Sequence, residues 1–146
     1  MGTIEDAAAQ IAEEIDAQHI WPLESNLGPG EEFGILRQRA AATARMMAAQ
    51  LASGDDKLAA QTAIDLASLI LPDDIPDDFW ATPLGRLIAK SAGHPSSDEV
   101  PYSVAAAMLG VSKTRVQQLV EAGKLERHPG GGITSVSVRL RAQGTA

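Results

Sequence analysis

The sequence predicts an all-α fold with one small β-hairpin, in which an N-terminal helical domain (residues 1–77) precedes a C-terminal domain (residues 78–146). Apolar residues recur at three- and four-residue spacing through most of the chain, which is the pattern of amphipathic helices. Alanine is abundant and aromatic residues make up only 3% of the chain, so small aliphatic side chains must form the core, which favours closely packed helices.

Charge is divided unevenly between the two predicted domains. The whole chain has a net charge of −7, but residues 1–80 contain 15 acidic and 4 basic side chains, a net of −11, whereas residues 81–146 contain 4 acidic and 8 basic ones, a net of +4. Only the basic part, residues 81–146, is expected to bind phosphate groups. The acidic part is expected to be solvated or to bind a basic protein partner.

Several classes of function lack the residues that they need. The chain has no cysteine, which excludes disulfides, thiol chemistry and cysteine-based zinc sites. Its histidines (His19, His94 and His128) lack metal-ligand spacing, and there is no phosphate-binding loop, catalytic triad or acid–base pair. We therefore expect no enzyme activity, no metal and no cofactor. The acidic start is unlike a signal peptide and no apolar run reaches about 18 residues, so we expect a cytoplasmic protein without a membrane span.

The N-terminal domain is predicted to be three helices, of which the last two form an antiparallel hairpin. A hairpin with an alanine- and leucine-rich face buries little surface alone, so we expect it to pack on the first helix, on a copy of itself, or on both. This is the basis for predicting a homodimer. The helices are expected over residues 3–18, 31–53 and 57–71, and the inward stripe of the second contains Phe33, Leu36, Ala40, Ala44, Met47 and Leu51.

Turn-forming residues mark the connections in this domain. Trp21-Pro22 and Gly28-Pro29-Gly30 indicate a loop over residues 20–30, with Trp21 in the core or at a dimer interface. Either Asp55 or Asp56 is expected to cap the third helix.

The predicted domain boundary is the acidic, proline-containing segment 72–78. Thr82 followed by Pro83 then resembles an N-cap and first residue of a supporting helix that ends at Gly93. Residues 94–100 are expected to be a loop.

The stretch from Ser103 to Gly123 contains two short helical patterns joined by a tight turn. Gly110 lies at the turn, where a residue without a Cβ fits best. Ser112 can cap the second helix and Gly123 can end it. This is the pattern of a DNA-binding helix-turn-helix, with residues 112–122 as the recognition helix. The predicted inward residues are Ala105, Ala106, Leu109, Val111, Val116, Leu119 and Val120.

The outward face of the second helix suits DNA recognition. All of its polar side chains can donate hydrogen bonds and none is acidic. Arginine suits guanine, glutamine suits adenine, and lysine or threonine suits phosphate or a base edge. The alternative is an ordinary helical hairpin with a solvated polar face. These outward residues are Lys113, Thr114, Arg115, Gln117 and Gln118.

Residues 101–141 resemble the winged helix-turn-helix of the MerR and phage-excisionase type. The match is carried by the helix-turn-helix and by Gly123-Lys124-Leu125 at the exit of the recognition helix. The resemblance implies that residues 126–128 and 133–134 form the strands of a wing with its tip at Pro129–Gly132, where glycines can supply positive φ angles. It also implies a last helix that Ser135 or Ser137 caps and that carries Val136, Val138 and Leu140. MerR regulators carry this domain first, whereas here it comes last, so MerR-type sensing of small molecules is not implied.

The predicted interface for double-stranded DNA combines the recognition helix, the residues that follow it, the wing and the last helix. Arg127 and the wing tip are expected to contact the adjacent DNA backbone or minor groove. The predicted DNA-contacting residues are Ser112, Lys113, Thr114, Arg115, Gln117, Gln118, Lys124, Arg127, His128, Gly130, Gly131, Arg139 and Arg141.

Three functions are compatible with this interface. The first is a sequence-specific transcriptional regulator, either a repressor or an antitoxin-like autoregulator, that binds an inverted repeat as a dimer because a monomer reads too few base pairs. The second is an excisionase-like architectural protein that bends DNA. The third is a helix-turn-helix that serves only as a protein-interaction module.

Overall fold

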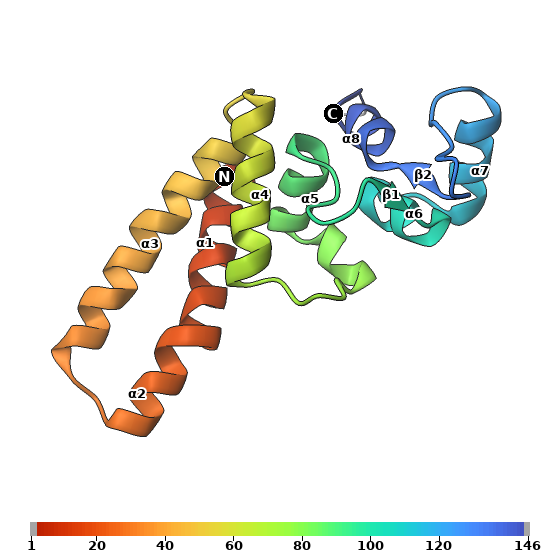
Figure 1. Cartoon of the computed structure of the whole chain (residues 1–146). Coiled ribbons are helices and arrows are strands. Elements are labelled where there is room, and N and C mark those ends of the chain that lie inside the picture. The colour runs from red at the N-terminus through yellow and green to blue at the C-terminus, as the bar shows by residue number, and fades with distance from the viewer. Residues whose placement is uncertain (1–2, 145–146) are drawn as a thin grey trace.

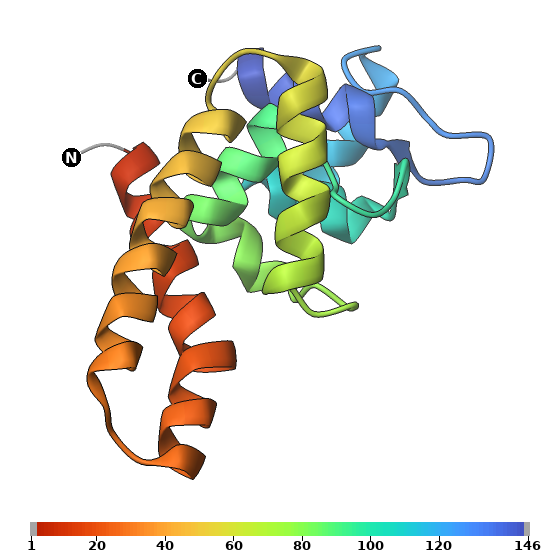
Figure 2. The same cartoon turned by 60° about the vertical axis from the view of Figure 1, so that its left-hand side comes forward.

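The computed structural model describes residues 3–144 as a mostly helical molecule with one two-stranded antiparallel sheet (Figure 1). This confirms the prediction of helices with a little β-structure. The N-terminal helices extend into a long arm, and the C-terminal elements cluster on one side of it (Figures 1 and 2). The helical elements are α1 (Thr3–Ile15), η1 (Asp16–Ile20), α2 (Trp21–Leu27), α3 (Glu31–Leu51), α4 (Asp56–Leu69), η2 (Asp77–Ala81), α5 (Pro83–Ser91), α6 (Tyr102–Leu109), α7 (Lys113–Glu121) and α8 (Ser135–Gly144), and the strands are β1 (Glu99–Val100) and β2 (Ile133–Thr134).

Residues 3–27 form one continuous rod rather than a helix followed by a loop. Its middle part, η1, is a π-helical turn in which the Trp21 amide donates to the Asp16 carbonyl five residues earlier. Pro22 has no amide hydrogen and its ring would press on the carbonyl four residues back in an α-helix, so a wider turn lets the helix continue. The predicted loop over residues 20–30 is therefore wrong except at residues 28–30, and Trp21, which is 60% exposed, does not lie in the core.

Along this rod, α3 runs back in the opposite direction (Figure 1). The predicted inward stripe of α3 is buried as expected except at one position, because Leu36 is exposed. The small side chains of Ala40 and Ala44 leave space for α1 to approach closely. The buried side chains of α3 are Phe33, Ala40, Ala44, Met47, Ala48 and Leu51.

Arg37 joins α3 to two parts of the rod. Its Nε lies 3.0 Å from Asp16 Oδ2, and its Nη2 lies 2.7 Å from Glu24 Oε1. The hydrogen bond from Arg37 lowers the pKa of Glu24, and the bonds to Glu24 and Asp16 raise the pKa of Arg37. This three-residue contact fixes α2 against α3 beyond the π-helical turn.

The hairpin of α3 and α4 is confirmed, since the two helices pack against each other. Asp55 rather than Asp56 caps α4, because its carboxylate accepts from the amides of Lys57 and Leu58 at 3.1 Å. The predicted cap of α5 is also present, with Thr82 Oγ1 accepting from the Gly85 amide at 3.1 Å.

The hydrophobic core continues across the predicted boundary at residues 77 and 78. Trp80, Leu84 and Ile88 are fully buried, and α5 packs against both α1 and α4. A single cluster of buried side chains extends from α1 to α8. The segment 72–78 therefore marks a change in charge and composition but not a gap in packing. Within residues 3–144, no helix is both long and apolar enough to cross a lipid bilayer.

The small sheet differs from the predicted hairpin in its partner strand. β2 pairs with β1, with Glu99 opposite Thr134 and Val100 opposite Ile133, although residues 94–100 were expected to be a loop. The expected strand at residues 126–128 contributes only a single bridge from Arg127 to Ile133. The wing-like loop is therefore anchored to a segment more than 30 residues earlier, a long-range pairing that turn signals do not reveal.

The cap of α8 also differs from the prediction. Thr134, rather than Ser135 or Ser137, takes this role, because its Oγ1 accepts from the Ser137 amide at 3.2 Å. The buried hydroxyl of Ser135 instead accepts from the His94 amide at 2.7 Å and connects α8 to the segment after α5.

Candidate functional site

The geometry of α6, the turn and α7 follows from a few local interactions. Gly110 ends α6 in the left-handed conformation with φ +70°, and the Val111 amide reaches back to the Ala106 carbonyl at 3.0 Å. Ser112 then caps α7 by accepting from the Arg115 amide at 3.0 Å. Both residues do what the sequence predicts.

Two side chains of α7 hold it against the rest of the molecule. Val116 and Leu119 are buried, as predicted. Val111 was expected to join them but remains exposed in the turn, so it does not fix the angle between the helices. Gly123, with φ +74°, ends the helix as predicted, and the Lys124 amide donates to the Leu119 carbonyl at 2.8 Å.

The predicted outward face of α7 is exposed along its length. Arg115 Nη1 lies 3.4 Å from Gln118 Oε1, and no hydrogen bond or ion pair to an acidic residue is recorded for this face within residues 3–144. The donors are thus directed to solvent and remain available to a ligand. The exposed residues are Lys113, Thr114, Arg115, Gln117 and Gln118.

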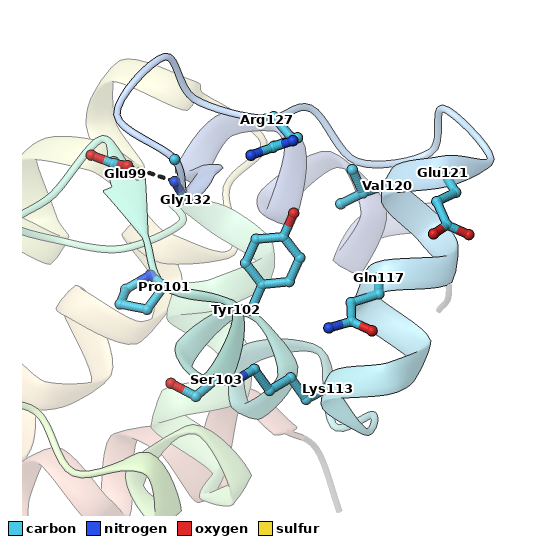
Figure 3. A pocket seen from close by; sticks show the side chains of 11 residues that line it. Glu99, Pro101, Tyr102, Ser103, Lys113, Gln117, Val120, Glu121, Arg127 and Gly132 are labelled. Carbon is cyan, nitrogen blue, oxygen red and sulfur yellow. Dashed lines mark hydrogen bonds between the residues drawn. The ribbon is translucent and has the colours of Figure 1, made fainter.

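A groove of about 840 Å³ lies between α7, the start of α6 and the loop that precedes β2 (Figure 3). The ring of Tyr102 lies across its middle, with the hydroxyl directed towards Arg127 and Val120. Lys113 extends from α7 towards Ser103 on the opposite side. The groove therefore brings together one lysine, one arginine and the first turn of α6.

Two carboxylates share this groove. Glu121 projects from the last turn of α7, on the side that lines it, and Glu99 lies at the opposite end (Figure 3). Glu99 Oε2 accepts from the Gly132 amide at 2.7 Å, which occupies part of its hydrogen-bonding capacity. The two acids offset the charges of Lys113 and Arg127, so the groove itself is not strongly basic.

One glycine of the loop has the predicted role of supplying a positive φ, and the other two have a different role. Only Gly131 has a positive φ, at +105°. A Cβ on Gly130 would lie 2.6 Å from the Glu99 carboxylate, and one on Gly132 would lie 2.6 Å from the Val100 carbonyl. Glycine at these two positions therefore permits the close approach to β1.

His128 is partly buried and lies beside two acidic side chains. Its Nδ1 accepts from the Gly130 amide at 3.0 Å and lies 3.4 Å from Glu99 Oε1, while its Nε2 lies 3.9 Å from Asp98 Oδ2. The hydrogen bond from Gly130 closes the tip of the loop. Both ring nitrogens of His128, which was predicted to contact DNA, lie near acidic side chains.

The two arginines of α8 are not brought to the groove. Arg139 is largely buried and its Nη1 lies 3.7 Å from Asp56 Oδ1 at the start of α4. Arg141 lies in the last turn of α8, which packs on α5 and α6. The structure thus separates Arg139 and Arg141 from the face that carries Lys113 and Arg115, because α8 runs back towards the N-terminal half (Figure 1). Lys124, Gly130 and Gly131 are exposed.

The sequence did not predict the polar groove residues Glu99, Tyr102, Ser103 and Glu121 as part of the site. Pro101 precedes Tyr102 and is the N-cap of α6. A proline just before a helical pattern indicates where a helix begins, so the start of α6 was predictable. Glu99 had no such signal, because its place depends on pairing with β2.

Within residues 3–144, no group of three or more histidine, cysteine, aspartate or glutamate side chains could hold a metal ion. No protein-family model matches this chain, and no curated protein or solved structure is significantly similar to it.

Proposed function

We propose that residues 101–141 act as a winged helix-turn-helix that binds double-stranded DNA in a sequence-specific manner, and that the protein is a transcriptional regulator. The observation that carries this proposal is the exposed face of α7, which presents five hydrogen-bond donors without an acidic partner in the described part of the chain. The resemblance of this segment to MerR and excisionase-type domains gives the same expectation.

In this proposal α7 enters the major groove. Its nine residues correspond to a helix of about 14 Å, and the major groove is about 12 Å wide. Arg115 and Gln118 are the residues assigned to base edges, since arginine pairs with guanine and glutamine with adenine. Thr114 and Lys124, at the two ends of the helix, are assigned to phosphates.

The groove beside α7 is assigned to one sugar–phosphate strand. The first amides of α6, the Tyr102 hydroxyl, Lys113 and Arg127 all border it and can donate to phosphate oxygens. Glu121 is assigned a different role, because a carboxylate repels phosphate but accepts from the amino group of cytosine. At this position Glu121 is therefore expected to increase the preference for particular DNA sequences and to lower the affinity for DNA of any sequence.

Selection from a randomised duplex library, followed by sequencing and by anisotropy titrations at about 50 and 200 mM salt, tests this function. An enriched inverted repeat with salt-dependent affinity is expected. Arg115→Ala combined with Gln118→Ala should abolish the sequence preference. Absence of binding at the lower salt concentration would refute the proposal.

A matched pair of lysine variants checks the assigned face. Lys113→Ala should lower the slope of log affinity against log salt by about 0.9, since one phosphate contact is lost. Lys57→Ala removes an exposed lysine from the first turn of α4 and should leave the slope unchanged. Equal effects of the two substitutions would indicate non-specific charge attraction.

The same selection separates the regulator from two other functions. Several direct repeats, loaded cooperatively, would instead indicate an excisionase-like architectural protein. The presence of Glu99 and Glu121 beside Lys113 and Arg127 favours, as a second candidate, a groove that binds a peptide with charges of both signs. That candidate predicts no selection of any duplex, together with loss of a protein partner on Arg127→Glu.

A further inference from the structure

Helix α3 has two apolar faces, of which only one is used within the chain. The inward face packs on α1 through buried side chains that include Phe33 and Ala44. On the opposite side, Ile35, Ala42 and Met46 are all exposed, with 64% of Ile35 and 53% of Met46 accessible. Positions separated by seven and eleven residues lie within about 20° of one line along an α-helix, so these three form a single stripe.

The stripe faces away from the body of the molecule. The described elements that pack against α3 include η1, α1, α4 and α5, and α2 reaches it through the ion pair between Glu24 and Arg37 on the inner side. Figures 1 and 2 show α3 along the outer edge of the arm, with no element of residues 3–144 covering that edge. An exposed apolar stripe of this kind on a helix indicates a contact surface.

Charges at the two ends of the stripe indicate what covers it. Glu31 and Glu32 are exposed in the first turn of α3, and Arg45 is exposed near its other end. None of them has a recorded ionic partner within residues 3–144, whereas Arg37 on the inner side is paired twice. The helix thus presents an acidic first turn, an apolar stripe, and two exposed arginines, Arg39 beside the middle of the stripe and Arg45 near its other end.

We propose that a second copy of this chain docks on the stripe, with the two α3 helices antiparallel about a two-fold axis near Gln38 and Arg39. In this arrangement the acidic end of each helix lies opposite Arg45 of the other, and Ile35 and Met46 are covered. A parallel arrangement would instead place Glu31 and Glu32 beside their own copies. The surface is self-complementary, as a two-fold interface requires.

The length of α3 is sufficient for such an interface. Its 21 residues span about 30 Å, so two copies can lie side by side over roughly the diameter of a small domain. The inference concerns the N-terminal half alone and does not depend on DNA binding, so its outcome is separate from that of the proposed function.

Sedimentation velocity of the full chain without DNA, over a wide range of protein concentration, tests the proposal. A dimer is expected, and Ile35→Lys combined with Met46→Lys should raise its dissociation constant by about tenfold or more. Both side chains are exposed in the monomer, so the circular dichroism spectrum should not change. Leu140→Lys is the matched control, because Leu140 is 55% exposed on α8 and should leave the dimer intact. A wild-type monomer at all concentrations, or equal effects of both changes, would overturn the proposal.

A charge exchange tests the direction of the two helices. Arg45→Glu should weaken an antiparallel dimer, because it places a carboxylate opposite Glu31 and Glu32 of the other copy. Glu31→Lys and Glu32→Lys, added to Arg45→Glu, should restore the affinity. In a parallel dimer Arg45 would face its own copy, so Arg45→Glu would exchange one like-charge pair for another and leave the affinity nearly unchanged. That result, or no recovery in the triple variant, would show that the proposed arrangement is wrong.

Discussion

The side chain of Gln10 in α1 completes the cap of α5 together with Thr82. Gln10 Nε2 donates to Thr82 Oγ1 at 2.9 Å, and Gln10 Oε1 accepts from the Leu84 amide at 2.8 Å. Thr82 Oγ1 also accepts from the Gly85 amide. A residue of the acidic N-terminal half therefore satisfies amide groups at the start of a helix in the basic C-terminal half.

This contact predicts that the two halves unfold together. Gln10→Ala should lower the free energy of unfolding by about 1–3 kcal/mol, because it leaves a partly buried amide without a partner. Gln61→Ala, which removes only an exposed bond to Asp65 four residues along α4, should change it by less than about 0.5 kcal/mol. Urea unfolding followed by circular dichroism and by tryptophan fluorescence measures both effects. Transitions that do not coincide would show that the halves unfold independently.

Two glycine-to-alanine substitutions are expected to have opposite signs. A Cβ on Gly85 would lie 2.7 Å from Trp80 Cα and would also meet the Phe79 carbonyl, so Gly85→Ala should destabilise the protein by about 1–3 kcal/mol or more. A Cβ on Gly34, within α3, meets nothing within 4 Å, so Gly34→Ala should stabilise it by about 0.5–1 kcal/mol. Thermal melts of the two variants measure both effects. An unchanged melting temperature for Gly85→Ala would contradict the packing of η2 on α5.

His94 is expected to make stability depend on pH. Burial lowers the pKa of His94, whose ring lies 5.6 Å from that of Trp80. Because the unfolded state then binds a proton more readily, the free energy of unfolding rises with pH, and this contribution is lost as the pH falls below about 6.5. Melting temperatures from about pH 5 to pH 8 should therefore vary more in the wild type than in His94→Asn. If the melting temperatures of the two proteins varied equally with pH, His94 would not be the cause of the pH dependence.

The two tryptophans should report different environments. Trp80 is fully buried, whereas Trp21 is 60% exposed near the free end of the arm. Iodide should quench part of the wild-type fluorescence, and Trp21→Phe should leave a blue-shifted emission that iodide barely affects. Strong quenching in Trp21→Phe would mean that Trp80 is accessible and the core around α5 is open.

Local features of the fold were predictable because the interacting groups lie within a few residues of each other. Asp55, Thr82 and Ser112 each cap a helix through an amide two or three residues later, and Gly110 and Gly123 end helices through their own conformation. Such features depend on side-chain reach and on φ alone, both of which the residue type determines.

Features that depend on distant partners were not predictable in this way. β1 was missed because Glu99 and Val100 become a strand only through pairing with β2. The contact of His128 with Glu99 and the contact of Arg139 with Asp56 likewise depend on tertiary placement. The exposure of the outward face of α7 was predicted correctly from the spacing of its apolar residues. The groove beside α7 was not predictable in this way, because it combines residues from three separate segments.

The π-helical turn in the rod determines which side of the rod the side chains after it face. Ile15 and Ile20 are both buried although they are five residues apart, a separation that would place them on different faces of a regular α-helix. The turn therefore holds one residue more than the helical period needs. Removing Ala17 would return Ile20 to helical spacing and keep every later side chain of α2 on its face, but Pro22 would then press on the carbonyl four residues before it. The length of the arm and the presence of this proline are thus coupled: a chain one residue shorter is expected to keep a straight arm only when Pro22 is replaced as well.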